Sequence, residues 1–262
     1  MLYYLAPPQT HKYDQKGIFK PVHLAVGLSC LGWLYLTPVS AQIIPDSTLG
    51  IEQSIIDSGL DLSNSPIDLV QGGAIRGDNL FHSFLEFNIG TNQRVYFANP
   101  GSIDRIISRV TGNNASFIDG TLGVAGNADL YLFNPNGILF GPNAQLDING
   151  SFLASTANGL DWGNGLEFNA TNPQAPPLLT IDLPVSLTFA PNNTSALSSQ
   201  GQLTTGADLT LAAERLELQG SVEAGGDINL LANQQVQIRD TPNQPFNAAA
   251  QGDLLIQGKS WH

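Results

Sequence analysis

The sequence predicts an all-β chain folded as a parallel β-helix, a solenoid whose successive coils stack on one another. Three observations support this fold class. Segments of about 20 residues repeat after residue 200, short apolar runs alternate with polar turns, and 27 Gly and 16 Pro accompany only 12% charged residues. A repeat of about 20 residues with short strands is typical of solenoids, because each coil buries its inward side chains on its neighbours.

The first 41 residues have the pattern of a secretory signal peptide. Three lysines lie before residue 21, an apolar run follows over residues 22–37, and small residues end the segment at Ala41. This order predicts export by the general secretory translocon and cleavage between Ala41 and Gln42. A transmembrane anchor is the alternative, but the run is shorter than the roughly 20 apolar residues that a membrane-spanning helix requires.

Cysteine content and net charge limit how the chain can be stabilised and which partners it can bind. Cys30 is the one cysteine and lies inside the predicted signal peptide, so strand ladders rather than disulfides must hold the exported chain together. The formal net charge is −12, and no basic patch occurs anywhere in the sequence. An acidic surface repels nucleic acid and anionic lipid, so we expect no nucleic-acid partner.

Between residues 42 and 90, short apolar stretches alternate with Asp, Asn, Ser and Gly, a pattern that predicts strands and turns. The aromatic cluster around Phe81, Phe84 and Phe87 is expected to pack a core or an N-terminal cap.

Residues 102–112 have a different pattern. Ile103, Ile106, Ile107 and Val110 follow the i, i+3, i+4, i+7 spacing, Ser102 can cap the start, and Gly112 can end the segment. This spacing predicts one short amphipathic helix.

The repeats predict which residues stack on which. Copies begin at Gly201 and Gly220, an offset of 220 − 201 = 19 residues, and a third copy follows after a loop over residues 241–247. The expected matches are Leu203 with Val222, Leu209 with Ile228, Leu211 with Leu230, Leu216 with Val236 at an offset of 20, and Asp208 with Asp227 and Asp253.

Residues 134–137, Asn-Pro-Asn-Gly, separate two apolar runs, and a second turn follows at residues 141–143. Asn at the first turn position bonds nearby main chain, Pro at the second fixes φ, and Gly suits the last position of a type I turn. Turn chemistry alone leaves two readings open, a structural corner or a recognition site.

The stretch LFNPNGILFGPNAQLDINGSFLASTAN resembles the second signature of the haemagglutination-activity, or two-partner-secretion, domain of filamentous haemagglutinin-type exoproteins. A further signature, Asn-Pro-Asn-Leu, is met in part, because Gly101 and Ser102 replace its last two residues. The upstream HSFLEFNIG is similar to the family's aromatic segment, and the resemblance covers roughly residues 43–160. The residues that match the two signatures are Asn99, Pro100, Asn134, Pro135, Asn136, Gly137 and Ile138.

The resemblance implies a right-handed β-helix with an N-terminal cap and extra-helical β-hairpins. It implies a partner, an outer-membrane β-barrel transporter whose POTRA domains recognise the matched residues, and delivery to the cell surface or medium. We accordingly expect a signal peptide over 1–41, a secretion domain over 42–190 and the start of a repeat shaft over 191–262. An adhesin of this type would bind a host surface, an abiotic surface or a carbohydrate once outside.

A secreted β-helix that binds or cleaves polysaccharide is the alternative function. Asp208, Asp227 and Asp253 recur on successive coils and could form an acidic column or bind Ca²⁺, but the simpler reading is that they cap turns. After the signal, histidine occurs only at His82 and His262, too few and too far apart for a zinc site. We therefore predict no enzyme activity, no catalytic residues, no cofactor and no metal.

Overall fold

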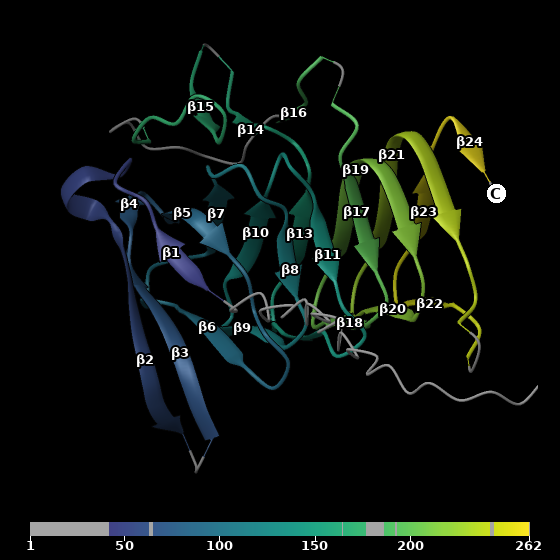
Figure 1. The fold of residues 1–262 in the computed structure, drawn as a ribbon, viewed down its shortest axis with the longest axis horizontal. Coiled ribbons are helices and arrows are strands. Elements are labelled where there is room, and N and C mark those ends of the chain that lie inside the picture. Colours follow the sequence, from purple (N-terminus) through teal and green to yellow (C-terminus); the bar gives the residue numbers. More distant parts are fainter. Residues whose placement is uncertain are drawn as a thin grey trace, which may run out of the picture. The chain divides into compact units, whose positions relative to one another are not determined.

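The computed structural model describes residues 42–62, 65–163, 165–176, 186–191, 193–241 and 244–261. The predicted signal peptide with Ala41 lies outside these residues, and Gln42 is the first described residue. Apart from one short 3-10 helix, every regular element of the described chain is a strand, and the prediction of an all-β parallel β-helix is confirmed (Figure 1). Within the described part, no helix is long and apolar enough to cross a membrane.

Each coil of the β-helix turns through three walls whose strands pair in parallel with those of the next coil. Wall 1 contains β5 (Asn79–Phe87), β7 (Arg105–Val110), β10 (Asp129–Phe133), β13 (Phe152–Ser155), the first halves of β19 (Leu209–Leu218) and β21 (Ile228–Ile238), and β23 (Leu254–Gln257). Wall 2 contains β8 (Ser116–Ile118), β11 (Ile138–Phe140), β17 (Ala196–Ser199), the second halves of β19 and β21, and β24 (Ser260–Trp261). Wall 3 contains β3 (Ser65–Gly72), β6 (Arg94–Ala98), β9 (Thr121–Ala125), β12 (Gln145–Asp147), β18 (Gln202–Thr205), β20 (Ser221–Ala224) and β22 (Asn247–Ala250).

An N-terminal cap covers the first coil with antiparallel strands. β1 (Ile43–Pro45) and β4 (Ala74–Arg76) both pair with β5, while β2 (Ser54–Leu62) pairs with β3 in a long hairpin. A short 3-10 helix, η1 (Gly50–Glu52), connects β1 to β2. The cap pairs with the strand edges that the first coil would otherwise leave open, as terminal capping elements of solenoids do.

A side sheet interrupts the coils between β13 and β17. It contains β14 (Gly159–Asp161), β15 (Glu167–Asn169) and β16 (Ser186–Thr188), paired antiparallel in the order β15-β14-β16. Its apolar residues pack on the outward face of wall 1 and form a second core, separate from the one inside the coils. The members of this second core are Leu49, Ala74, Phe81, Ile107, Phe133, Leu160 and Phe168.

The main core fills the interior of the coils. Parallel pairing places Phe152 on Leu130, Leu209 on Phe152 and Ile228 on Leu209, and all four side chains are fully or almost fully buried. Burial of one such side chain contributes about 1.5–3 kcal/mol, so the stacked column stabilises every coil that it passes through.

The predicted helix over residues 102–112 is wrong. Residues 105–110 form strand β7, with Ile106, Ile107 and Val110 all buried. Wall 1 is covered on both faces here, by the main core inside and by the second core outside. A strand buried on both faces carries a continuous apolar run rather than an alternating one, and such a run can match a helical spacing.

The repeat alignment is confirmed residue by residue. Leu203 pairs with Val222, Leu209 with Ile228 and Leu211 with Leu230. A bulge in the register between Ala213 and Arg215 absorbs one extra residue of β21. The bulge explains why the offset grows from 19 to 20 residues, as in the pair Leu216 and Val236. The third copy also aligns as predicted, because Leu254 pairs with Ile228.

Candidate functional site

The structure places the two Asn-Pro motifs at different corners of the β-helix. Asn99 and Pro100 follow β6 at the corner between walls 3 and 1, whereas residues 134–137 follow β10 at the corner between walls 1 and 2. The two corners lie at opposite ends of wall 1, whose five-residue strand β10 is about 17 Å long at a rise of about 3.3 Å per residue. The predicted recognition residues therefore form two separate positions rather than one site.

Asn134 is fully buried and holds its corner to the preceding coil. Its amide Nδ2 donates to the carbonyl oxygen of Asn114 and to Ser116 Oγ, both at 3.0 Å. Its Oδ1 accepts the main-chain N–H of Asn136 at 3.0 Å, and its carbonyl oxygen accepts the N–H of Gly137 at 3.1 Å, which closes the turn. Because every one of these partners lies within the fold, the Asn134 side chain stabilises the corner and is inaccessible to a binding partner.

The rest of this motif divides into buried and exposed residues. Gly137 is buried and has φ of +122°, a conformation that favours glycine, and Ile138 belongs to the main core. Asn136 is exposed, although its Nδ2 donates to the carbonyl oxygen of Gly112 at 2.8 Å, and Pro135 is half-buried. Only Pro135 and Asn136 are available on the surface of the motif.

Asn99 connects its corner to the following coil. Its Oδ1 accepts the main-chain N–H groups of Asn127 at 3.0 Å and Ala128 at 3.1 Å, and its Nδ2 donates to the carbonyl oxygen of Ile103 at 2.9 Å. A Cβ at Gly126 would lie 2.1 Å from Asn99 Oδ1, so this contact requires glycine there. The incomplete first motif thus retains an asparagine that joins two coils, as Asn134 does.

A third corner was missed as a candidate site. Asp119 Oδ1 accepts the main-chain N–H of Asn143 at 3.0 Å, its Oδ2 accepts Asn143 Nδ2 at 3.0 Å, and Thr91 Oγ1 also donates to it. Burial acts to raise the pKa of Asp119, but the hydrogen bonds from Thr91 and Asn143 outweigh burial and leave this pKa below its ordinary value. The Gly-Pro-Asn turn was visible in the sequence, but nothing there identified Asp119, 24 residues away, as its partner.

The aspartate column at the start of wall 1 bonds the main chain of neighbouring coils. Asp208 Oδ1 accepts the N–H of Asp227 at 2.8 Å, and Asp227 Oδ1 accepts the N–H of Asp253 at 2.7 Å. The reading of these aspartates as caps of turns is therefore confirmed for Asp208 and Asp227 and remains a prediction for Asp253. Among the described residues, no three His, Cys, Asp or Glu side chains are grouped so that they could hold a metal ion.

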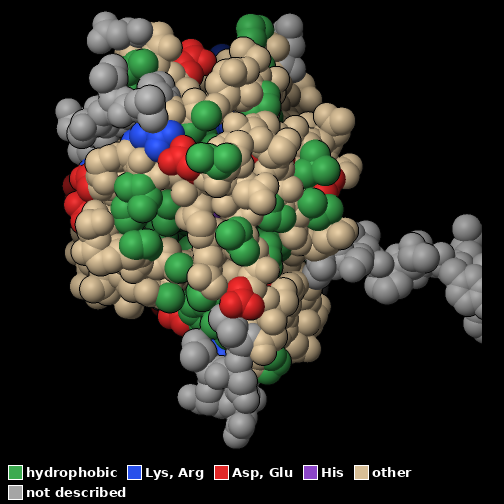
Figure 2. All heavy atoms as spheres, turned by 90° about the vertical axis from the view of Figure 1, so that its left-hand side faces the viewer, with side chains coloured by type: hydrophobic (Ala, Val, Ile, Leu, Met, Phe, Trp, Pro, Cys, Tyr) green, Lys and Arg blue, Asp and Glu red, His purple; other side chains and the backbone are tan. Residues whose placement is uncertain are grey.

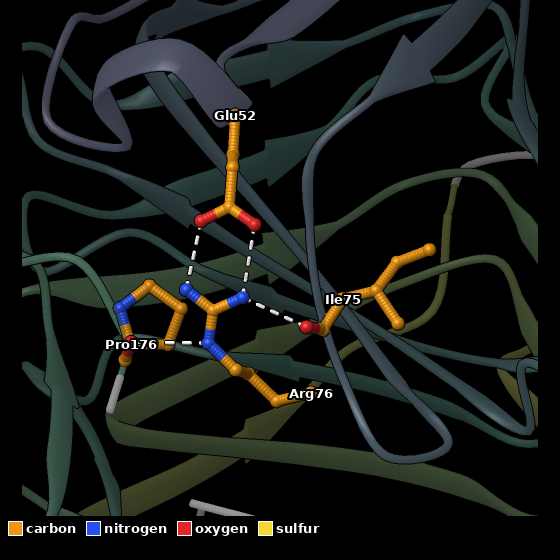
Figure 3. Close-up of polar contacts among 4 residues, drawn as sticks. All are labelled: Glu52, Ile75, Arg76 and Pro176. Atoms are coloured by element: carbon orange, nitrogen blue, oxygen red, sulfur yellow. Dashed lines mark hydrogen bonds and ion pairs between the residues drawn. The ribbon is translucent and has the colours of Figure 1, made fainter. Parts of the chain in front are cut away.

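Arg76 joins the cap to the segment that follows β15, and sequence reasoning missed it. Figure 3 shows its guanidinium facing Glu52. Two guanidinium nitrogens donate to the two carboxylate oxygens of Glu52, at 3.0 and 2.8 Å. The guanidinium also donates to the carbonyl oxygens of Pro176 and Ile75, at 3.3 and 2.7 Å. The hydrogen bond from Arg76 lowers the pKa of Glu52. A bidentate contact between arginine and a carboxylate is among the stronger polar interactions in proteins.

Arg109 makes a second connection of this kind from β7. Its side chain is fully buried, and its guanidinium lies 3.9 Å from the centre of the Phe168 ring. It donates to Ser83 Oγ, to Thr48 Oγ1 and to the carbonyl oxygen of Asn169, each at 2.9 Å. Burial lowers the pKa of Arg109 to about 10, so the group stays charged at neutral pH. Cap, wall 1 and side sheet therefore meet at one buried cation.

Comparison with known proteins places this architecture among secretion domains. The profile described as "TPS secretion domain" matches residues 41–260. A heme/hemopexin-binding protein of Haemophilus influenzae strain Rd is 39% identical over 69 residues, which are 26% of this chain and 7% of that protein. A second protein of that name from Haemophilus influenzae is 39% identical over 70 residues, 27% of this chain and 7% of its own length. The chain thus spans a small part of these relatives.

A solved structure also matches the chain. The crystal structure of the HMW1 secretion domain from Haemophilus influenzae aligns with a TM-score of 0.38 and 17% identity, over 77% of this chain and 63% of that one.

Proposed function

This chain belongs to the TPS secretion domain family, and from that premise we propose that it is the secretion domain of a two-partner-secretion exoprotein of the filamentous haemagglutinin type. The observation that carries the proposal is the family match over residues 41–260, which includes the cap, the side sheet and all the coils. The predicted division at residues 190 and 191 remains a prediction, and the family match continues across it.

The proposed route begins with the signal peptide and the general secretory translocon. The POTRA domains of an outer-membrane β-barrel transporter then recognise the domain, and the exoprotein reaches the cell surface or the medium. Two features of the sequence and fold support this route. The chain has no cysteine after Cys30, and each coil is completed by hydrogen bonds to the coil before it. A chain of this kind can fold outside the cell without disulfide chemistry, one coil at a time.

In this proposal the Asn-Pro motifs act by building the corners. Asn99 and Asn134 place neighbouring coils in register, and Pro100, Pro135 and Asn136 are the parts of the motifs that reach the surface. Loss of either asparagine would disturb the folded shape that the transporter recognises rather than remove a direct contact.

We also propose that the domain works by recognition and has no catalytic activity. The carboxylates that recur on the coils support this, because Asp208 and Asp227 are already bonded to main-chain N–H groups. An adhesive activity towards a host surface, an abiotic surface or carbohydrate is proposed for the whole exoprotein rather than for this domain.

Co-expression with and without the candidate transporter tests the function. The protein is expected in the medium or on the cell surface only when the transporter is present, and the Asn134→Ala variant is expected to remain largely inside. Thr204→Ala, at an exposed position on wall 3, is the matched control and should be exported like the wild-type protein. Export without the transporter, or depolymerisation of pectin-like polysaccharide by the purified domain, would contradict the proposal.

A further inference from the structure

Strand β2 is the outermost strand of the sheet that forms wall 3. It pairs with β3, which pairs in turn with β6 through residues 68–70. Among the described residues, no strand pairs with the other edge of β2. Figure 1 shows the β2–β3 hairpin extending away from the coils at the N-terminal end. The outer edge of β2 therefore has main-chain groups available for another strand.

This edge carries little of the usual protection against strand addition. Exposed edges are commonly blocked by charged side chains, lysine above all, by proline or by a bulge. Residues 55–58 contain no lysine and no proline, Asp57 is their one charged residue, and the register shift of the hairpin begins only after Ser58, next to Gly59 with φ of +78°. Ser54 is buried, so the four consecutive residues 55–58 of β2 can accept a partner strand.

The surface beside the edge is apolar. Ser54 faces inward, where its hydroxyl lies 3.0 Å from His82 Nδ1, so the next side chain, Ile55, faces outward and is 54% exposed. Ile51 and Ile75, which flank the hairpin in sequence, are also exposed. Figure 2 looks onto this end of the molecule and shows hydrophobic side chains at several places on its surface. An extended partner could cover Ile55 while it pairs with the main chain.

The charge of this region indicates what the partner carries. Residues 42–75 contain five acidic residues and no lysine or arginine. Asp46 and Glu52 are bonded within the fold, to Thr48 and to Arg76. The hairpin itself carries Asp57, Asp61 and Asp68 and has a net charge of 0 − 3 = −3. Asp57 and Asp68 accept hydrogen bonds from the neutral amides of Gln71 and Gln93, which leave this charge in place. A partner strand that carries lysine or arginine complements this charge, whereas an acidic one is repelled.

We propose that residues 55–58 of β2 are the docking edge for an extended, basic strand of the transporter's periplasmic domain. The inference rests on the proposed function and assigns its recognition step to the cap rather than to the Asn-Pro corners. Main-chain hydrogen bonds to β2 supply affinity, and contacts with Ile55 and Asp57 supply specificity.

The other N-terminal edges are less suited to this role. β1 has three residues, ends at Pro45 and has a bulge before that proline. β8 also has three residues, and Ile89 already bridges to Ile118 on it. β2 offers the longest unprotected edge of the cap.

Binding of the folded chain, without its signal peptide, to the purified periplasmic domains of its transporter tests the proposal. Ile55→Lys is expected to weaken binding about tenfold or more, because it removes the apolar contact and adds a repulsive charge. Leu255→Lys is the matched control, since Leu255 is 48% exposed on β23 at the other end of the coils, and its affinity should stay within about twofold of wild type. Asp57→Lys should weaken binding about threefold and flatten its dependence on salt.

The outcomes separate this inference from the proposed function. Thermal unfolding identifies any variant that fails to fold, and Ile55→Ser, a milder change, then replaces Ile55→Lys. If wild type binds and the folded Ile55 variants bind equally well, or if Leu255→Lys is just as damaging, the docking edge is wrong while the secretion function stands. If the wild-type domain does not bind and is exported without the transporter, the proposed function itself fails.

Discussion

The coils after residue 196 and the region before it are held together by different kinds of contact. In the later coils, stacked positions carry similar residues, such as Leu209 on Ile228, and the aspartates bond from coil to coil. In the earlier region, Arg76 and Arg109 connect the cap, wall 1 and the side sheet. Repetition stabilises a coil through its nearest neighbours alone, whereas a cap must be held by contacts that no repeat supplies.

The hydrogen-bonded partners are much farther apart in sequence in the earlier region than in the later coils. Arg76 reaches the carbonyl oxygen of Pro176 across 100 residues, and Arg109 reaches Thr48 across 61 residues and Asn169 across 60. Contacts between neighbouring aspartates span 19 and 26 residues. The cap and side sheet should therefore lose structure together, while damage to one later coil should stay local. The following predictions test that contrast, starting with the largest effect.

Arg109→Met should lower the free energy of unfolding by about 3 kcal/mol, because Thr48, Ser83 and the carbonyl oxygen of Asn169 lose a buried charged donor. Urea unfolding measures the change. Arg239→Met, at an exposed position beyond β21, is the control and should stay within about 0.5 kcal/mol of wild type. Equal effects of the two substitutions would show that the buried cation does not hold the cap.

His82 should make the cap sensitive to mild acid. The side chain is fully buried, and burial lowers its pKa to about 3 from the ordinary 6.5. The unfolded chain therefore takes up a proton first, so stability is fully present above pH 6.5 and falls as the pH drops toward 3. At pH 5 the loss should be about 2 kcal/mol, from 1.36 kcal/mol per pH unit over about 1.5 units.

Urea unfolding between pH 7 and 5 checks this expectation. The variant His82→Phe keeps an aromatic ring beside Phe84 and Phe97, and its stability should change less over this range even if it is lower at pH 7. The same slope in both proteins would rule out His82 as the cause.

Glu52→Gln should weaken the cap by about 1 kcal/mol, because Glu52 is partly exposed and its pair with Arg76 is screened by solvent. The pKa of Glu52 is lowered by the hydrogen bond from Arg76, so its contribution is present above the ordinary value of 4.5 and is lost as the pH falls through the lower folded value. The difference between wild type and Glu52→Gln in thermal unfolding should thus shrink below pH 4.5. A constant difference would contradict the pairing.

Asp227→Ala should have the smallest effect, about 0.5 kcal/mol, because it removes one exposed hydrogen bond to the N–H of Asp253. Hydrogen exchange should increase in the coils around β21 and remain unchanged in the cap. Faster exchange in β4 or β5 would show that the later coils and the cap are coupled, which would remove the contrast between the two regions.

The sequence by itself determined the solenoid, the stacking of the later coils and the corner at residues 134–137. Each of these depends on a pattern within one or two coils: the 19-residue offset, strand alternation, and the dihedral preferences of asparagine, proline and glycine. The tertiary structure alone decided that residues 105–110 form a strand, that Asn134 is buried, and that Arg76 and Arg109 join the cap to the side sheet. The arginine contacts join segments that lie 60 to 100 residues apart in the sequence. A local sequence pattern does not show which distant segment will pack over a given residue.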